Sequence, residues 1–195
     1  RPLMSFPTWF FDYDNDGWDD LLVSSYFLSV DETARRYLRR PPNAGTMKLY
    51  RNRGNGTFDD VTAQTGLDRV YMPMGSNFGD VDNDGDVDLF VTTVRGGNVL
   101  FENQGGGRFR DITQTAGVGY IGHSSGAVLF DYDRDGRLDL FVANVGRYTT
   151  DLKAGVFPYY LGYVDAFSGH LMPERSERSI LYRNAGGNRF EDVSD

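Results

Sequence analysis

Short apolar runs recur along the chain, and each one directly follows an acidic segment that contains glycine. The runs cover residues 21–26, 89–94 and 140–145 and consist mainly of Leu, Val and Phe. Brief apolar runs of this composition, bounded by turn residues, are typical of strands that are buried rather than of helices. The pattern therefore predicts a β-rich chain built from an internal repeat.

A second apolar phrase follows each run, at residues 49–52, 100–103 and 181–184, and reads Leu, aromatic, any residue, Asn. Nine residues after each Leu comes an aromatic, namely Phe58, Phe109 and Phe190, with a glycine-rich turn between them. Such a turn between apolar segments predicts a β-hairpin. Each unit is therefore predicted to form four short antiparallel strands, as in a β-propeller blade.

The repeat divides the chain into three expected blades within a single repeat domain, residues 1–195. The acidic loops begin at Asp12, Asp80 and Asp131, so they are 68 and 51 residues apart. We predict blade 1 at 1–68, blade 2 at 69–118 and blade 3 at 119–195. The extra length predicts an insert near 29–45 in blade 1, with helical character at 33–40, and a larger one near 147–179 in blade 3.

The loops share the pattern D-x-D-x-D-G-x-x-D, in which alternate side chains of a tight turn can converge on one point. The acids at places one, three, five and nine are Asp12, Asp14, Asp16 and Asp20; Asp80, Asp82, Asp84 and Asp88; and Asp131, Asp133, Asp135 and Asp139. The seventh place varies as Trp18, Asp86 and Arg137, as expected if it offers a backbone carbonyl. Carboxylate and carbonyl oxygens favour Ca²⁺ over Mg²⁺, so three calcium sites are predicted.

Two other readings of the loops compete with this one. An EF-hand would place Glu at the twelfth position, but Val23, Val91 and Val142 stand there and a strand rather than a helix is expected to follow. The loops could also be plain polar turns, and three copies that share all four acids and the glycine argue against that reading.

Composition excludes several classes of function. The formal charge is −8, but 12 of the 28 acidic residues belong to the three loops, so the acidity reflects the cation sites. Nothing indicates a nucleic-acid partner, and no apolar run approaches a membrane span. The chain has no cysteine and starts without a signal-peptide pattern, which indicates either a removed leader or an internal piece.

A hydrolase motif is matched at residues 122–126, which read Gly-His-Ser-Ser-Gly. The nucleophile elbow needs a strand before it and a helix after it, whereas a strand is expected to follow here. His123 and His170 are the two histidines, and no acid–base cluster is evident outside the loops. No enzyme activity is predicted.

The phrases FDYDNDG, LYRNRGNGTFDDVT and GHLMPERSERSILYRN resemble calcium-binding FG-GAP/VCBS repeats, the integrin-α-like propeller blades. More narrowly, they are similar to the bacterial branch related to cartilage acidic protein. The resemblance covers essentially the whole chain and implies a propeller fold, Ca²⁺ in the loops between the first two strands, an extracellular or cell-surface location and no defined catalytic activity. Propellers of that class have about seven blades, and three are predicted here.

The expected function is therefore a calcium-binding extracellular structural or adhesion module. The alternatives are a lectin-like carbohydrate-binding module and, less favoured, a non-catalytic domain of a polysaccharide-acting enzyme. A protein or glycan partner is expected at the blade 3 insert, whose aromatic residues are Tyr148, Phe157, Tyr159, Tyr160, Tyr163 and Phe167. Three blades leave sheet faces uncovered, so the missing contacts would come from further blades of a longer chain or from homo-oligomers that join head to tail into a ring or filament.

Overall fold

The computed structural model describes residues 5–25, 47–67, 73–153, 160–166 and 171–195. These residues form three four-stranded antiparallel sheets, as the repeat predicts. The predicted insert at 29–45 and its helix at 33–40 lie wholly outside the described residues. His170, Phe157, Tyr159 and Phe167 also lie outside them.

Each sheet is built from strands in chain order. The first contains β1 (Ser5–Phe11), β2 (Asp20–Ser25), β3 (Met47–Asn52) and β4 (Phe58–Asp60). The second contains β5 (Pro73–Gly79), β6 (Asp88–Thr93), β7 (Val99–Asn103) and β8 (Phe109–Asp111). The third contains β9 (Ser124–Phe130), β10 (Asp139–Asn144), β13 (Ile180–Gly186) and β14 (Arg189–Asp192).

A small hairpin interrupts the third sheet between its second and third strands. It consists of β11 (Thr149–Lys153) and β12 (Tyr160–Gly162), and the 3-10 turn η2 (Pro173–Arg175) precedes β13. One-turn helices, α2 (Thr62–Thr65) and α3 (Thr113–Ala116), follow the first and second sheets. None of the helices in the described part of the chain is long and apolar enough to cross a membrane.

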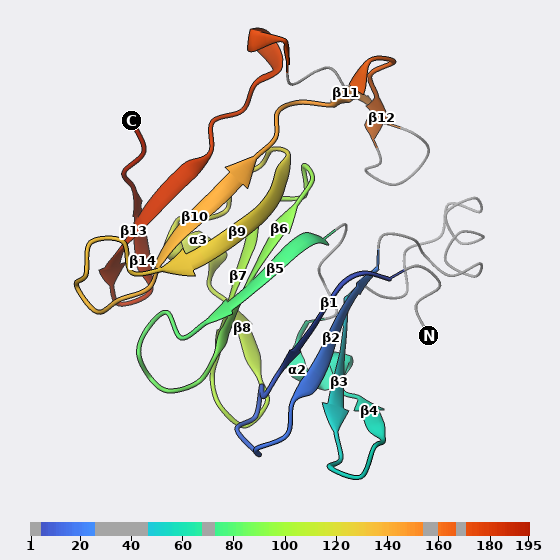
Figure 1. The fold of residues 1–195 in the computed structure, drawn as a ribbon, viewed down its shortest axis with the longest axis vertical. Coiled ribbons are helices and arrows are strands. Elements are labelled where there is room, and N and C mark those ends of the chain that lie inside the picture. The colour runs from blue at the N-terminus through green and yellow to red at the C-terminus, as the bar shows by residue number, and fades with distance from the viewer. Residues whose placement is uncertain (1–4, 26–46, 68–72, 154–159, 167–170) are drawn as a thin grey trace.

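The register repeats from sheet to sheet. The residue just before each loop pairs with the aspartate at its ninth place: Phe11 with Asp20, Gly79 with Asp88 and Phe130 with Asp139. Each of the three loops therefore closes the turn between the first and second strand of its sheet. Figure 1 shows these three turns on one side of the molecule, at the lower left of the view.

The sheets stand face to face in an open row, with the second in the middle, and the apolar core fills the two spaces between them (Figure 1). Every residue of β6 is buried, since Leu89 and Val91 face the first core cluster and Phe90 faces the second. A strand covered on both faces reads as a continuous apolar run, whereas a half-exposed strand alternates. That explains why an apolar run, rather than alternation, marked β6 in the sequence.

Candidate metal centres

The three acidic loops have the same backbone conformation. Their fourth residues, Asn15, Asn83 and Arg134, all have positive φ angles, of 56°, 61° and 63°. The glycines at the sixth place also have positive φ, 87° at Gly17 and 94° at Gly85. A side chain opposes this conformation, so the glycine is required by the turn itself.

The aspartate at the first place of each loop organises the turn by accepting backbone hydrogen bonds. In the second loop, Asp80 Oδ1 accepts from the Asp84 amide at 3.1 Å, and Oδ2 accepts from the Gly85 amide at 2.9 Å. Asp12 and Asp131 accept the corresponding pairs of bonds in the other two loops. The loops are therefore held in shape by their own carboxylates.

The aspartate at the ninth place is fully buried and connects the loop to the third strand. Asp88 Oδ2 accepts from the Val81 amide and Oδ1 from the Asn103 amide, both at 2.8 Å. Asp20 and Asp139 accept the equivalent bonds. Burial raises the pKa of Asp88 to about 7 and that of Asp20 to about 6, although these amide bonds favour the charged form.

In each loop, oxygens of the acids at the first, third and ninth places lie within 4.8 Å of one another. The three groups consist of Asp12, Asp14 and Asp20; Asp80, Asp82 and Asp88; and Asp131, Asp133 and Asp139. Such clusters of carboxylate oxygens, each with one member wholly buried, can hold a cation.

The acids at the fifth place stand outside these oxygen groups. Asp16 pairs with Arg51 at 2.9 Å, and Asp135 pairs with Arg137. Asp84 Oδ1 accepts from the Asp86 amide at 2.8 Å. The same amide bond is present at Trp18 and Arg137, so the fifth-place acid holds the seventh-place backbone.

Two carboxylate oxygens of the third-place acids support a metal-binding role for the clusters. Asp14 Oδ1 and Asp82 Oδ1 are buried and have no hydrogen-bond partner. Their second oxygens are occupied, Asp14 Oδ2 by Arg51 Nε at 2.8 Å and Asp82 Oδ2 by Asn188 Nδ2 at 3.1 Å. Burial raises the pKa of both carboxyl groups, and the neighbouring loop acids add to this shift. A bound cation fits this environment because it would coordinate the unpaired oxygens and compensate the clustered charge.

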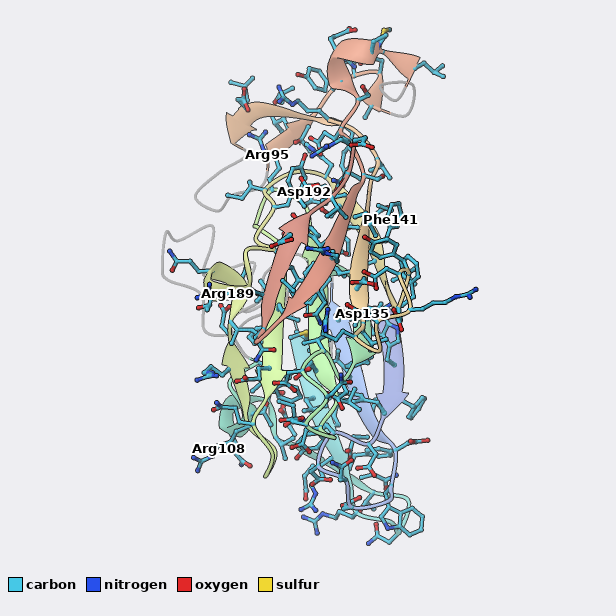
Figure 2. The ribbon with its side chains drawn as sticks, turned by 90° about the vertical axis from the view of Figure 1, so that its left-hand side faces the viewer. Arg95, Arg108, Asp135, Phe141, Arg189 and Asp192 are labelled. Carbon is cyan, nitrogen blue, oxygen red and sulfur yellow. The ribbon has the colours of Figure 1, made fainter. Side chains whose placement is uncertain are left out.

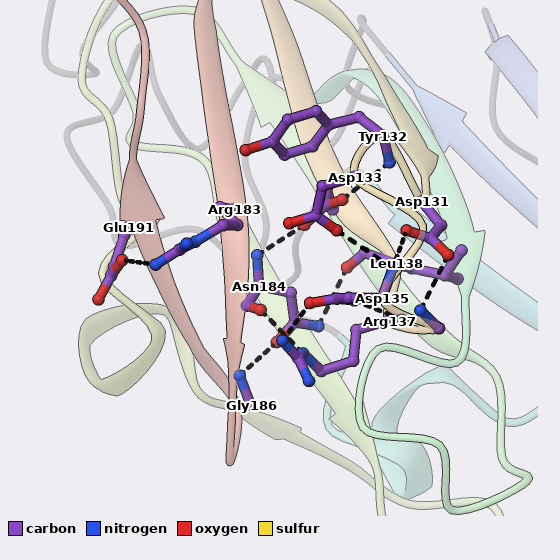
Figure 3. A network of polar contacts seen from close by, with 12 residues as sticks. Asp131, Tyr132, Asp133, Asp135, Arg137, Leu138, Arg183, Asn184, Gly186 and Glu191 are labelled. Carbon is purple, nitrogen blue, oxygen red and sulfur yellow. Dashed lines mark hydrogen bonds and ion pairs between the residues drawn. The ribbon is translucent and has the colours of Figure 1, made fainter.

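Figure 3 shows the third loop and the strand that supports it. Asn184 of β13 donates from its backbone to Asp139 and from Nδ2 to the carbonyl of Leu138 at 3.0 Å. Arg137 Nε donates to the Asn184 carbonyl at 3.0 Å. The Asn of the repeated Leu-aromatic-x-Asn phrase is thus part of the loop's support, a role that the sequence analysis did not assign.

The hydrolase-like motif has a structural role. β9 begins at Ser124, so a strand follows, and the His123 side chain is only 2% exposed. His123 Nδ1 lies 2.8 Å from Glu177 Oε1, and Nε2 lies 2.8 Å from Thr149 Oγ1. This carboxylate–imidazole–hydroxyl line is enclosed, and it ties the insert to the third sheet. Sequence reasoning missed it because its members are far apart in the chain.

The described aromatic residues of the insert contact the protein itself. The Tyr148 ring packs edge-on against His123 with centroids 4.6 Å apart, and the Arg175 guanidinium lies 4.0 Å from the centroid of Tyr163. Arg175 also pairs with Asp165 at 2.8 Å.

Comparison with known proteins places these loops in a family. The model of the FG-GAP-like repeat matches residues 12–91 and 80–142, so it covers all three acidic loops. The chain is also 34% identical over 94 residues to cartilage acidic protein 1 of Xenopus tropicalis and of Mus musculus, and 33% identical to that of Homo sapiens. These matches cover 48% of this chain but only 14–15% of the relatives. The chain belongs to the FG-GAP-like repeat family.

Proposed function

We propose that this chain is a calcium-binding structural or adhesion module of the β-propeller type that works outside the cytoplasm. Its sheets would be propeller blades, each with one Ca²⁺ in the loop between its first and second strands. The observation that carries the proposal is the repeated oxygen cluster, with buried unpaired oxygens at Asp14 and Asp82. Membership of the FG-GAP-like family supports a structural rather than a catalytic role.

The proposed role of the ion is mechanical. In each loop it would join the residue that follows the first strand, the middle of the loop and the start of the second strand, because its three acids stand at these places. It would also neutralise carboxylates that the fold brings within 4.8 Å of one another. Sites of this kind fill at the millimolar Ca²⁺ found outside cells and stabilise the folded state through binding.

Calcium binding can be tested by calorimetry and by thermal unfolding. We expect three Ca²⁺ per chain, weak or no response to Mg²⁺, and a melting temperature that falls by roughly 10 °C or more in excess chelator. An unchanged melting temperature with no heat of binding would refute the proposal.

Substitutions in the second loop identify the ligands. Asp82→Asn removes one member of the oxygen cluster, so we expect two ions per chain instead of three. Asp86→Asn is the matched control, since it removes the same charge from the same loop at a side chain outside the cluster. Asp84→Asn tests whether the fifth-place acid is a ligand as well. Loss of one ion would show that it is, whereas three bound ions would limit the acidic ligands to the three-acid cluster.

A carbohydrate-binding function remains the alternative for the insert. The described rings of Tyr148 and Tyr163 do not favour it, because His123 and Arg175 already occupy faces or edges of these rings. Binding to a glycan array that is lost in Tyr163→Ala would favour the alternative.

A further inference from the structure

The first and second loops present similar oxygen clusters. In both, the third-place acid has one buried oxygen without a hydrogen-bond partner, Asp14 Oδ1 and Asp82 Oδ1. In both, the ninth-place acid is fully buried and accepts amide hydrogen bonds from the second place of the loop and from the third strand. A difference in cation affinity between these two loops is therefore expected to come from the charges around the cluster.

One matched position carries opposite charges in the first two sheets. It is the third residue of the repeated Leu-aromatic-x-Asn phrase, which is Arg51 in β3, Glu102 in β7 and Arg183 in β13. The strands around it have the same register, since each of these residues pairs with the middle of the fourth strand. The change of charge is therefore a property of the sequence and not of a different fold.

Arg51 contacts two acids of the first loop. Its Nε lies 2.8 Å from Asp14 Oδ2, and its Nη2 lies 2.9 Å from Asp16 Oδ2. The guanidinium thus binds the second oxygen of a cluster acid and compensates part of the negative charge of the loop. A cation that enters this loop is repelled by a positive charge on the same carboxylate.

Glu102 adds negative charge beside the second loop instead. It is 8% exposed, and Asn188 Nδ2 donates both to Glu102 Oε1 at 2.7 Å and to Asp82 Oδ2 at 3.1 Å. Arg110 pairs with the other oxygen, Glu102 Oε2, at 2.6 Å. One neutral amide therefore holds two carboxylates close together, and such a pair attracts a cation.

The asparagine that connects these two acids stands where the other two sheets have glycine. Asn188 keeps the positive φ of that position, 58°, and the matched residue of the second sheet is Gly107, with φ of 75°. A β-carbon at Gly107 would lie 3.0 Å from the ring of Tyr13, whereas the second loop has the smaller Val81 at the place of Tyr13. The second loop therefore has room for a side chain that holds an additional acid near the cluster.

The third loop resembles the first in its charges. Asp135, which Figure 2 shows below Phe141, pairs with Arg137 of the same loop. Arg183, the residue matched to Arg51, turns to Glu191 and pairs with it at 2.6 Å (Figure 3). Within the described ranges, an arginine thus forms an ion pair with an acid of the first loop and of the third, but not of the second.

We infer that the three loops bind calcium with unequal affinity, and that the second loop binds it most tightly because Arg51 and Glu102 place opposite charges beside matched clusters. The inference rests on the proposed calcium-binding function and adds a graded response to it. As the calcium concentration falls, the first and third loops would lose their ions before the second does. Their arginines would then remain as internal counter-charges.

Titration calorimetry with Ca²⁺ tests the ranking. We expect one binding step that is tighter than the others by about tenfold or more. Asp82→Asn should abolish this tight step, whereas Asp14→Asn should leave it in place. Equal affinities in the unmodified chain, or a tight step that survives in Asp82→Asn, would overturn the inference. Absence of any binding heat would refute the proposed function itself, so the two failures are distinguishable.

Terbium emission measures binding at the first loop. Tb³⁺ binds oxygen ligands as Ca²⁺ does, and its emission is excited through a nearby tryptophan. The chain has two tryptophans, Trp9 in β1 and Trp18 at the seventh place of the first loop, and the other two loops contain none. Arg51→Gln should lower the Tb³⁺ concentration at half-maximal emission by about tenfold. A variant that merely damaged the fold would raise this concentration, and an unchanged value would overturn the inference.

Two further variants complete the test. Arg53→Gln is the matched control for Arg51→Gln, because it removes the same charge from the same sheet at a side chain that pairs with the exposed Asp59. It should leave the terbium midpoint nearly unchanged. Glu102→Gln should weaken the tight calorimetric step by about threefold or more and leave the terbium midpoint in place. Equal effects of Arg53→Gln and Arg51→Gln, or a tight step that is unchanged in Glu102→Gln, would contradict the roles assigned to these charges.

Discussion

The second and third sheets carry closely similar residues in different surroundings. In the second, β6 is buried along its whole length because a neighbour covers each face. In the third, β10 holds Leu140 and Val142 in the core but exposes Phe141. The local sequence of a repeat therefore determines its strands, loop and register, whereas its stability depends on the repeats beside it, as in other repeat proteins.

The largest effect should come from truncating matched aromatics in the two sheets. Phe90→Ala should lower the free energy of unfolding by about 3–5 kcal/mol, since it leaves a cavity between the second and third sheets. Phe141→Ala should cost less than about 1 kcal/mol in the dilute chain. Denaturant unfolding of both variants at low concentration measures the difference, and equal losses would contradict the difference in burial.

The buried carboxylates of Asp20 and Asp88 should make the metal-free chain lose stability as pH rises. Burial raises the folded-state pKa of Asp88 to about 7 and of Asp20 to about 6, above the ordinary aspartate value of 3.8. Between pH about 4 and 7 the folded state therefore holds protons that the unfolded state has released, so the free energy of unfolding falls with pH by a few kcal/mol.

Unfolding in excess chelator across this pH range tests the linkage. Asp88→Asn should flatten the pH dependence, whatever its effect on stability at any one pH, and Asp86→Asn should leave the slope nearly unchanged. A slope that persists in Asp88→Asn would assign the effect to other groups.

Loss of the hydrogen bond between sheets, from Asn103 Nδ2 to the Tyr13 carbonyl, should cost more stability than loss of the matching asparagine of the first sheet, Asn52. Asn103→Ala removes the Nδ2 donor, which lies 2.9 Å from the Tyr13 carbonyl oxygen and 3.2 Å from that of Val87. We therefore expect the free energy of unfolding to fall by about 2–3 kcal/mol. Asn52→Ala removes a donor only to the carbonyl of Asp19, in the loop of its own sheet. We expect the free energy of unfolding to fall by about 1 kcal/mol. Thermal unfolding of both variants in calcium provides the comparison, and a larger loss in Asn52→Ala would reverse it.

The smallest effect concerns the fourth place of the loops, where the second has Asn83 and the third has Arg134. Both have positive φ, of 61° and 63°, which asparagine adopts more readily than arginine. Arg134→Asn should therefore stabilise the chain by about 0.5–1 kcal/mol. Asn83→Arg is the reciprocal variant and should destabilise the chain. The denaturant midpoints of the two variants, compared with that of the unmodified chain, show whether each change stabilises or destabilises.

The sequence was sufficient to predict the three four-stranded antiparallel sheets and the position of the acidic loops between their first and second strands. This worked because the pattern repeats, so each copy supported the interpretation of the others. The clustering of the first, third and ninth acids follows from the same spacing. Closure into a propeller and the identity of the ion remain predictions.

The contacts that depend on distant residues could not be predicted. Asn103 meets Tyr13 across 90 positions, and His123 meets Glu177 across 54. The hydrogen bond that the fifth-place acid accepts from the seventh-place amide, as at Asp84, was not predicted either, and its role as a metal ligand stays a prediction. Exposure of Phe141 was equally hidden, since no local pattern distinguishes it from Phe90.

The hydrogen bonds that Asn103 and Asn184 side chains donate to the preceding sheet's loop also have a consequence for how the chain is made. Because the donor always belongs to the later repeat, the loop of each repeat acquires its last internal partner only after the next repeat has been synthesised. The loop at Tyr13 waits for Asn103, and the loop at Val81 waits for Asn184. On the ribosome, where folding proceeds from the N-terminus, a nascent chain would therefore mature one repeat behind its own elongation.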